Sequence, residues 1–275
     1  MPAAVEILSP GRKQGAGSAP ALPLFASLDA APLARAKESR ATYSPGGTRS
    51  VASGRSARVR GGTGSIPSAS DPWSAATVHL IKADPTLAKI IREIGPCRLK
   101  RQKGGFAHLA QAVVNQQLSK TAADAIMKRL VALAGDKHLT AESLHALSDK
   151  ALKSAGISAR KIGYLRDLAE RVLSGQLDFH RLARLSDEEV IRELSQVKGI
   201  GRWTAEMYLI FVLCRPDVLP LDDTALCSAI ADLYRLKEKG DGASIAAMGE
   251  TWRPYRTAAS WYLWSWRNEA SKGTR

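Results

Sequence analysis

The sequence has few of the residues that build disulfide frameworks, metal centres and membrane spans. Its 275 residues include only three cysteines, Cys97, Cys214 and Cys227, and their positions match neither a Cys-x-x-Cys pair nor another metal-ligand spacing. No apolar run approaches the roughly 20 residues that a membrane-spanning helix requires. Acidic residues are also few, with 26 against 40 lysines and arginines. These absences argue against a cysteine metal site and a membrane span, and the scattered cysteines fit a reducing compartment.

The excess of basic residues indicates a polyanionic partner. The net charge is +14, the isoelectric point is near 9.9, and the hydrophobic fraction of 45% is ample for a folded core. Such a charge balance favours binding to nucleic acid. Composition alone leaves open a second interpretation, a basic protein without any nucleic-acid role. The length allows one large domain or two small ones.

Residues 1–70 differ in character from the rest of the chain. They are rich in Ala, Ser, Gly, Pro and Arg and show little hydrophobic periodicity. Such a segment cannot bury enough apolar surface to offset the entropy of ordering, so we predict a disordered basic arm. Two functional alternatives are a non-specific DNA-binding tail and an organelle-targeting segment, although Glu6, Asp29 and Glu38 weaken the second. A folded domain is predicted over residues 71–275.

Helical periodicity begins at residue 71 and continues towards the C-terminus. Apolar residues recur at three- and four-residue spacing, capping residues precede several segments, and no segment alternates as a strand would. We therefore predict an all-α fold. The predicted helices span residues 72–82, 85–94, 106–117, 121–134, 140–147, 149–155, 158–172, 186–196, 203–213 and 254–268, and another begins at 224.

A glycine hairpin, Lys198-Gly199-Ile200-Gly201, separates two of these helices. Two glycines around one aliphatic residue suit a tight turn, where the backbone takes positive φ and approaches its neighbours closely. The hairpin amides would then stand at the N-terminus of the helix that begins near Trp203. Amides and helix dipole together form a site for one phosphate group.

Two adjacent carboxylates follow in the segment Pro220-Leu221-Asp222-Asp223-Thr224. Asp223 stands close to the N-cap position of the next helix. Taken alone, these acids could do no more than cap that helix, which is the usual role of short acids before helices. A phosphate site one helix away from paired acids indicates instead an enzyme that acts on nucleic acid.

These segments resemble the helix-hairpin-helix DNA glycosylases. VKGIGRWTA is similar to the family's hairpin, and RPDVLPLDDTAL is similar to the Gly/Pro-rich loop that ends in the catalytic aspartate. The sequences NQQLS at 115–119 and WRPYR at 252–256 extend the resemblance over residues 72–267. The nearest branch is the DNA-3-methyladenine glycosylase II type.

The resemblance implies a two-lobed helical fold around a cleft and a defined reaction. The enzyme would bind double-stranded DNA, flip an alkylated purine such as 3-methyladenine or 7-methylguanine into the cleft, and hydrolyse its N-glycosidic bond. This reaction initiates base excision repair. No cofactor and no metal are expected, and the sequence lacks the four-cysteine iron–sulfur motif of some relatives. We expect an intracellular monomer, in the cytoplasm at a bacterial nucleoid or in a eukaryotic nucleus.

The resemblance also assigns the chemistry to particular residues. Asp223 is the catalytic carboxylate, which would stabilise a cationic sugar. Trp203 stands where strand-cleaving relatives carry a lysine nucleophile, so base removal without strand cleavage is implied. The base pocket is expected to comprise Trp203, Trp264, Met207 and Tyr208. Trp264 matches a tryptophan that stacks beside the flipped base, and an electron-rich ring suits a cationic purine.

Contacts with the DNA backbone are expected around the hairpin. Gln117 matches the region that inserts a wedge into the minor groove after flipping, with an unassigned exposed helix end as the alternative. Arg256 is a further phosphate candidate that could equally form an internal salt bridge, and Trp261 and Trp266 are expected in the core. The predicted DNA-binding residues are Gln117, Lys198, Gly199, Gly201 and Thr204, and weaker candidates are the segment 158–161 and Arg253.

Two other functions remain open at this stage. Hairpins also occur in proteins that only bind DNA, and a related glycosylase could act on another lesion such as a deaminated purine. Asp223 and the pocket tryptophans favour an enzyme, since a pure binder has no use for them. The lesion range is a separate question that these residues leave open.

Overall fold

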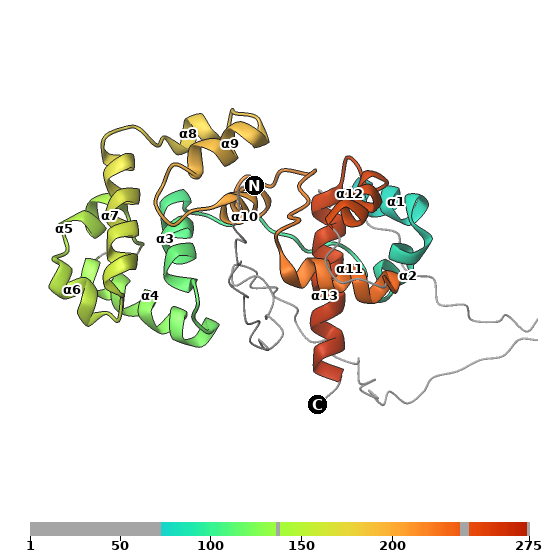
Figure 1. Ribbon diagram of the computed structural model, residues 1–275, viewed down its shortest axis with the longest axis horizontal. Coiled ribbons are helices and arrows are strands. Elements are labelled where there is room, and N and C mark those ends of the chain that lie inside the picture. The colour runs from blue at the N-terminus through green and yellow to red at the C-terminus, as the bar shows by residue number, and fades with distance from the viewer. Residues whose placement is uncertain (1–72, 136–137, 237–241, 274–275) are drawn as a thin grey trace, which may run out of the picture.

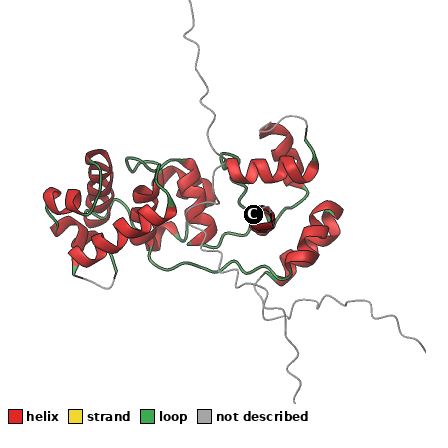
Figure 2. Ribbon diagram, turned by 90° about the horizontal axis from the view of Figure 1, so that it is seen from below, coloured by secondary structure: helices red, strands yellow, loops and turns green. Residues whose placement is uncertain are grey.

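The computed structural model describes residues 73–135, 138–236 and 242–273. The predicted disordered arm 1–70, the helix start at Asp71-Pro72 and the predicted domain boundary between residues 70 and 71 therefore lie outside the described residues. Within the described ranges the chain forms helices joined by loops and no strand, as Figure 2 shows. The prediction of an all-α fold is confirmed for this part of the chain.

The helices follow the chain in the order of their labels in Figure 1. Their bounds are α1 Ser74–Ala83, α2 Pro85–Ile94, α3 Gly105–Asn115, α4 Lys120–Ala134, α5 Ala141–Ala146, α6 Asp149–Ser154, α7 Ala159–Leu173, α8 Phe179–Leu182, α9 Asp187–Leu194, α10 Arg202–Phe211, α11 Thr224–Tyr234, α12 Gly242–Glu250 and α13 Arg256–Gly273.

Local capping explains why most predicted helices begin where they do. Asp84 accepts hydrogen bonds from the Thr86 and Leu87 amides at the start of α2, and Ser119 accepts one from Ala122 at the start of α4. The prediction missed α8 and α12. The first has only four residues, and the second is built largely from small residues without a strong apolar stripe.

The helices form two lobes with α10 between them (Figure 1). The first two helices pack with the last three, so the ends of the described chain share one lobe, and α13 contacts α1, α2 and α11. The other lobe contains α3 to α9, where α7 packs against α3 and α5. Because α10 contacts α3 and α9 and is followed directly by the loop into α11, residues on that loop lie between the lobes.

Aromatic side chains tie the terminal segments of the first lobe together. Trp252 and Tyr262 are both 0% exposed, and Asp84 accepts hydrogen bonds from Trp252 Nε1 at 2.9 Å and Tyr234 Oη at 2.6 Å. Trp261 is buried, as predicted, and Trp266 is partly buried against the core. Most of the C-terminal aromatic residues therefore stabilise the lobe rather than form an open surface.

Candidate active site

Asp223 has a buried carboxylate at the start of α11. It caps α11, with its Oδ1 accepting a hydrogen bond from the Leu226 amide at 2.7 Å and a second from Trp264 Nε1 at 3.2 Å. Its Oδ2 accepts a hydrogen bond from Trp203 Nε1 at 2.9 Å. The residue is 4% exposed. Both oxygens are therefore held in fixed directions by N–H donors from three different helices.

The neighbouring acid is in a different environment. Asp222 is exposed, while Asp223 is buried, although the two are adjacent in sequence. The loop makes a turn at this point, closed by a hydrogen bond from the Asp223 amide to the Pro220 carbonyl at 3.1 Å, and the Asp223 side chain is buried after it. Of these two adjacent acids, Asp223 has the enclosed, oriented carboxylate that electrostatic catalysis requires.

The two tryptophans on Asp223 differ in accessibility. Trp203, on the first turn of α10, is partly exposed, whereas Trp264 on α13 is 0% exposed. The Trp264 ring stacks on Phe211 with ring centroids 6.0 Å apart. Its contact with the candidate site is therefore the hydrogen bond to Asp223, and its expected stacking on a flipped base stays a prediction.

Met207 and Tyr208 lie within the core of the molecule. They are 0% and 1% exposed, and the Tyr208 ring lies 6.1 Å from His108 and 6.2 Å from Phe179. Burial raises the pKa of Tyr208 to about 12, so its hydroxyl stays protonated at neutral pH. The assignment of both residues to a base pocket stays a prediction, because in this structure other side chains enclose them.

The hairpin before α10 uses its two glycines differently. Gly199 has φ +81°, and a Cβ atom there would lie 2.3 Å from Tyr164 Cδ2. Gly201 is the N-cap of α10 with φ −102°, and a Cβ atom there would meet nothing within 4 Å. The turn therefore requires glycine at position 199 for both conformation and space, but not at position 201.

The side chains around the hairpin are oriented by α7. Lys198 donates its amide to Asp167 Oδ2 at 2.9 Å, and its ammonium lies 3.8 Å from Asp167 Oδ1. The Lys198 side chain is 72% exposed, whereas Thr204 is buried on the first turn of α10. Lys198 is therefore accessible to a ligand, and its ion-pair partner is Asp167.

The segment after α3 lies against the hairpin. Gln116 Nε2 donates a hydrogen bond to the Gly199 carbonyl at 2.7 Å. The next residue, Gln117, has φ +57° and is exposed. Gln116 already leaves the helical conformation, with φ −51° and ψ +126°, so the helix ends at Asn115 rather than at residue 117 as predicted. A left-handed backbone at a non-glycine residue such as Gln117 costs conformational energy.

Other predicted phosphate contacts are engaged within the protein. Arg256 pairs with Asp217 at 2.7 Å, and Arg253 pairs with the same carboxylate. Lys161 donates to two backbone carbonyls. The internal salt bridge considered for Arg256 is the arrangement that the structure shows.

Sequence inspection missed one buried acid in this region, Glu206 on α10. It is 4% exposed, and its Oε1 accepts a hydrogen bond from Arg202 Nε at 3.0 Å. Its Oε2 is buried and has no hydrogen-bond partner among the described residues. Burial raises the pKa of Glu206 to about 7, although the nearby Arg202 opposes the shift. The Arg202–Glu206 spacing of four residues was the available signal, since it places both side chains on one helix face.

Replacing Glu206 by glutamine is expected to stabilise the protein above neutral pH. The folded-state pKa lies above the ordinary 4.5, so the native state binds more protons than the unfolded state between those values. The contribution of Glu206 to the free energy of unfolding is therefore lost as the pH rises from 4.5 to about 7. We expect the variant to gain on the order of 1–3 kcal/mol at about pH 8 and little at about pH 5.

Thermal unfolding at both pH values measures this effect. Glu188→Gln is a matched control, because the exposed Glu188 pairs with the same Arg202 at 2.7 Å. Glu188→Gln should not show a gain in stability at the higher pH. A Glu206→Gln variant less stable than the wild type at both pH values would show that the Arg202 ion pair outweighs the burial cost.

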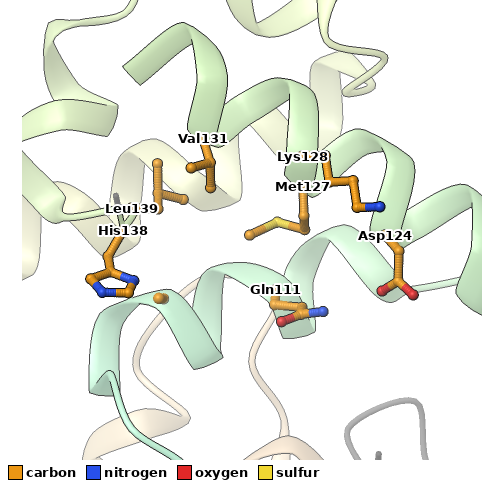
Figure 3. Close-up of a pocket in the computed structure, with 8 residues that line it drawn as sticks. Gln111, Asp124, Met127, Lys128, Val131, His138 and Leu139 are labelled. Carbon is orange, nitrogen blue, oxygen red and sulfur yellow. The ribbon is translucent and has the colours of Figure 1, made fainter. Parts of the chain in front are cut away.

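A separate cavity lies between α3 and α4 (Figure 3). It has a volume of about 490 Å³, and its lining includes Gln111, Asp124, Met127 and His138. None of the predicted site residues lines it. Within the described residues there is no cluster of three or more His, Cys, Asp or Glu side chains that could hold a metal ion, and no helix is long and apolar enough to cross a membrane.

A two-lobed helical fold that sets a glycine hairpin one helix before a buried aspartate is the arrangement of helix-hairpin-helix DNA enzymes. The chain belongs to the HhH-GPD superfamily of base excision DNA repair proteins, whose family model matches residues 110–254.

Individual relatives agree with this membership. The chain is 38% identical over 194 residues to DNA-3-methyladenine glycosylase 1 of Schizosaccharomyces pombe, an alignment that covers 69% of this chain and 85% of the relative. A crystal structure of a DNA-3-methyladenine glycosidase from Bacillus halodurans superposes with a TM-score of 0.67 at 36% identity, covering 74% of this chain and 92% of that one. The S. pombe 3-methyladenine DNA glycosylase in complex with abasic DNA gives a TM-score of 0.63 at 36% identity, covering 69% and 95%.

Proposed function

We propose that this chain excises alkylated purines from double-stranded DNA, with Asp223 as the carboxylate beside the reacting sugar. The chain is a 3-methyladenine DNA glycosylase of base excision repair, a function supported by several relatives of moderate identity. The single observation that supports the role of Asp223 is its buried side chain, which accepts hydrogen bonds from Trp203, Trp264 and Leu226.

The environment of Asp223 suits the charge that develops during base release. As the bond between C1′ and the purine nitrogen breaks, its electron pair leaves with the base and positive charge builds on the sugar. A fixed carboxylate in a water-poor site stabilises that charge without having to reorganise. Water then adds to C1′ and loses a proton. The partly exposed Trp203 ring offers a π-face for a cationic base such as 3-methyladenine or 7-methylguanine.

The DNA backbone and the gap left by the flipped base require separate contacts. The amides of the hairpin 198–201 stand at the N-terminus of α10 and suit one phosphate group. We assign the wedge to Gln117, whose exposed side chain follows a helix end bonded to the hairpin. The catalytic unit would be the predicted domain 71–275, acting as a monomer at the nucleoid or in the nucleus.

Base removal should leave an intact abasic site. Lyase chemistry needs an amine that attacks C1′, but the position beside Asp223 holds the Trp203 indole, and Lys198 is paired with Asp167. Borohydride should therefore trap no covalent protein–DNA adduct during turnover, and product strands should break only after alkali treatment. A strand-cleaving glycosylase serves as the positive control. An adduct that disappeared in Lys198→Ala would overturn this assignment.

A base-release assay with methylated DNA tests the proposed function directly. Release of methylated purines by the wild type is expected, and chromatography of the released bases identifies which ones are substrates. Tight DNA binding without any base release would support a binding module instead. Release of hypoxanthine in place of methylated purines from matched duplexes would identify a glycosylase for deaminated purines.

A further inference from the structure

One face of α7 contacts both of the segments proposed to hold DNA. Lys161, Tyr164 and Asp167 recur at three-residue spacing, so their side chains lie on the same side of the helix. Asp167 accepts the hairpin amide of Lys198, and Tyr164 fills the space beside Gly199. Lys161, one turn earlier, contacts the end of α3 instead.

Lys161 binds the backbone at the end of α3. Its ammonium donates hydrogen bonds of 2.7 Å to the carbonyl of Val114 and 2.7 Å to the carbonyl of Gln116. Carbonyls in the last turn of a helix have no partner within the helix, and a cation there also interacts favourably with the helix dipole. Bonds from a charged donor are stronger than neutral ones.

The same short segment is also bonded to the hairpin. The Gln116 side chain donates to the Gly199 carbonyl at 2.7 Å, while the Gln116 carbonyl accepts from Lys161. Gln116 is therefore held at both its side chain and its main chain. Gln117 follows immediately, with φ +57° and an exposed side chain. The Leu118 amide closes this turn with a hydrogen bond to the Asn115 carbonyl at 3.1 Å, and the two bonds to Gln116 hold the turn against the hairpin and α7.

Partly burying the Lys161 ammonium costs free energy, and an incidental contact would not offset that cost. Partial burial lowers the pKa of Lys161, and the adjacent Arg160 lowers it further. An ammonium with these neighbours could instead extend into solvent, as most surface lysines do. Its inward orientation, with both bonds made to backbone, gives Lys161 a structural task at the end of α3.

We propose that Lys161 is a positioning residue for base flipping, which holds the main chain of residues 114–116 so that Gln117 stands at a fixed place beside the hairpin. This inference rests on the proposed wedge role of Gln117. Displacing a group by about 1 Å can cost two orders of magnitude in rate even when the mutation is far from the chemistry. A wedge that loses its anchor would flip a paired base poorly, while phosphate binding and hydrolysis of an already unpaired base would be little affected.

The test compares a paired lesion with an unpaired one. Lys161→Met retains the aliphatic chain and removes both donors, and single-turnover excision of 7-methylguanine is measured opposite cytosine and opposite an abasic-site analogue. We expect about a tenfold or greater loss on the paired substrate, and less than about threefold loss on the unpaired substrate and in duplex affinity. Lys128→Met is the charge-matched control, since Lys128 is exposed on α4, and it should change neither rate.

Three outcomes would overturn the inference. Equal losses on both substrates would indicate a role in chemistry or folding, no loss on either would indicate no role, and a loss confined to affinity would make Lys161 a phosphate contact. If Lys161→Met does not fold, Lys161→Arg is compared on the same two substrates, with the paired lesion again expected to be the more affected. The lysine ammonium itself is the feature tested, so rates of Lys161→Arg should lie between wild type and Lys161→Met.

Gln117→Ala separates this inference from the function on which it rests. If both residues serve flipping, Lys161→Met should lower the paired rate less in the Gln117→Ala background than in the wild type. Full activity of Gln117→Ala on the paired lesion would remove Gln117 as the wedge. If Gln117→Ala were fully active and Lys161→Met still lowered the excision rate on the paired lesion alone, positioning of the segment 114–118 by Lys161 would still be supported.

Discussion

Replacing Asp223 by asparagine should lower single-turnover base excision about 100- to 1,000-fold, which corresponds to roughly 3–4 kcal/mol of lost transition-state stabilisation. Duplex affinity should change little. The substitution removes the negative charge beside the sugar and preserves the size of the side chain. The measurement is the rate of base release from a methylated duplex at saturating enzyme, together with the dissociation constant for the same duplex.

The geometry explains why the fold should survive this change. Oδ1 accepts from both the Leu226 amide and Trp264 Nε1, and an asparagine carbonyl oxygen can retain these two bonds. Asparagine also caps helices as well as aspartate does. Its amide nitrogen would then face Trp203 Nε1, a second donor, where Oδ2 now accepts. We therefore expect a modest loss of stability, on the order of 1 kcal/mol, from that one mismatched contact.

Asp222→Asn is the matched control. Asp222 is adjacent in sequence and chemically identical, but it is exposed. It should retain near-normal excision. An inactive Asp222→Asn combined with an active Asp223→Asn would contradict the assignment of the catalytic carboxylate. Loss of folding in Asp223→Asn would show that the mismatched contact with Trp203 Nε1 costs far more than expected.

Replacing Gly199 by valine should destroy the hairpin and weaken binding to damaged and undamaged duplexes alike. A β-branched residue at φ +81° is strained by about 1–3 kcal/mol. The added Cβ would lie 2.3 Å from the Tyr164 ring, and such overpacking costs a further 1–3 kcal/mol, approximately. The combined cost is a large fraction of the stability of a typical domain.

Circular dichroism, thermal unfolding and duplex affinity on both DNAs measure this effect. Gly201→Ala is the control, because position 201 has an extended backbone and open space around its Cβ direction. It should fold normally. Tyr164→Ala in the Gly199→Val background should recover part of the stability by removing the clash, although the φ strain remains. Affinity lost only for damaged DNA would argue against a role of the hairpin in backbone binding.

Local sequence determined the helices and the order of the motifs. The caps at Asp84, Ser119 and Ser158 act within three residues of the helix starts, so they could be read directly from the sequence. The positive φ at Gly199 is likewise a property of a short turn. These interactions depend on neighbours along the chain, and the family resemblance rests on the same short segments.

Tertiary structure alone decided which side chains surround Asp223 and which are enclosed. The bond from Trp264 crosses 41 positions and the bond from Trp203 crosses 20, so neither follows from local pattern. The packing of α10 between the lobes buries Met207 and Tyr208 and leaves one oxygen of Glu206 without a hydrogen-bond partner in the described part of the chain. Helical periodicity identifies a buried face but does not specify which element covers it.

The same limit applies to Lys161. From sequence it belonged to a basic segment that suited phosphate, because a lysine on a helix is usually a solvated charge. The end of α3 lies 45 positions away at Gln116, and only the packing of α7 against α3 brings its unpaired carbonyls to the ammonium. Sequence thus determined which groups were available, while the long-range packing of helices determined whether each faces DNA, the core or the backbone of another helix.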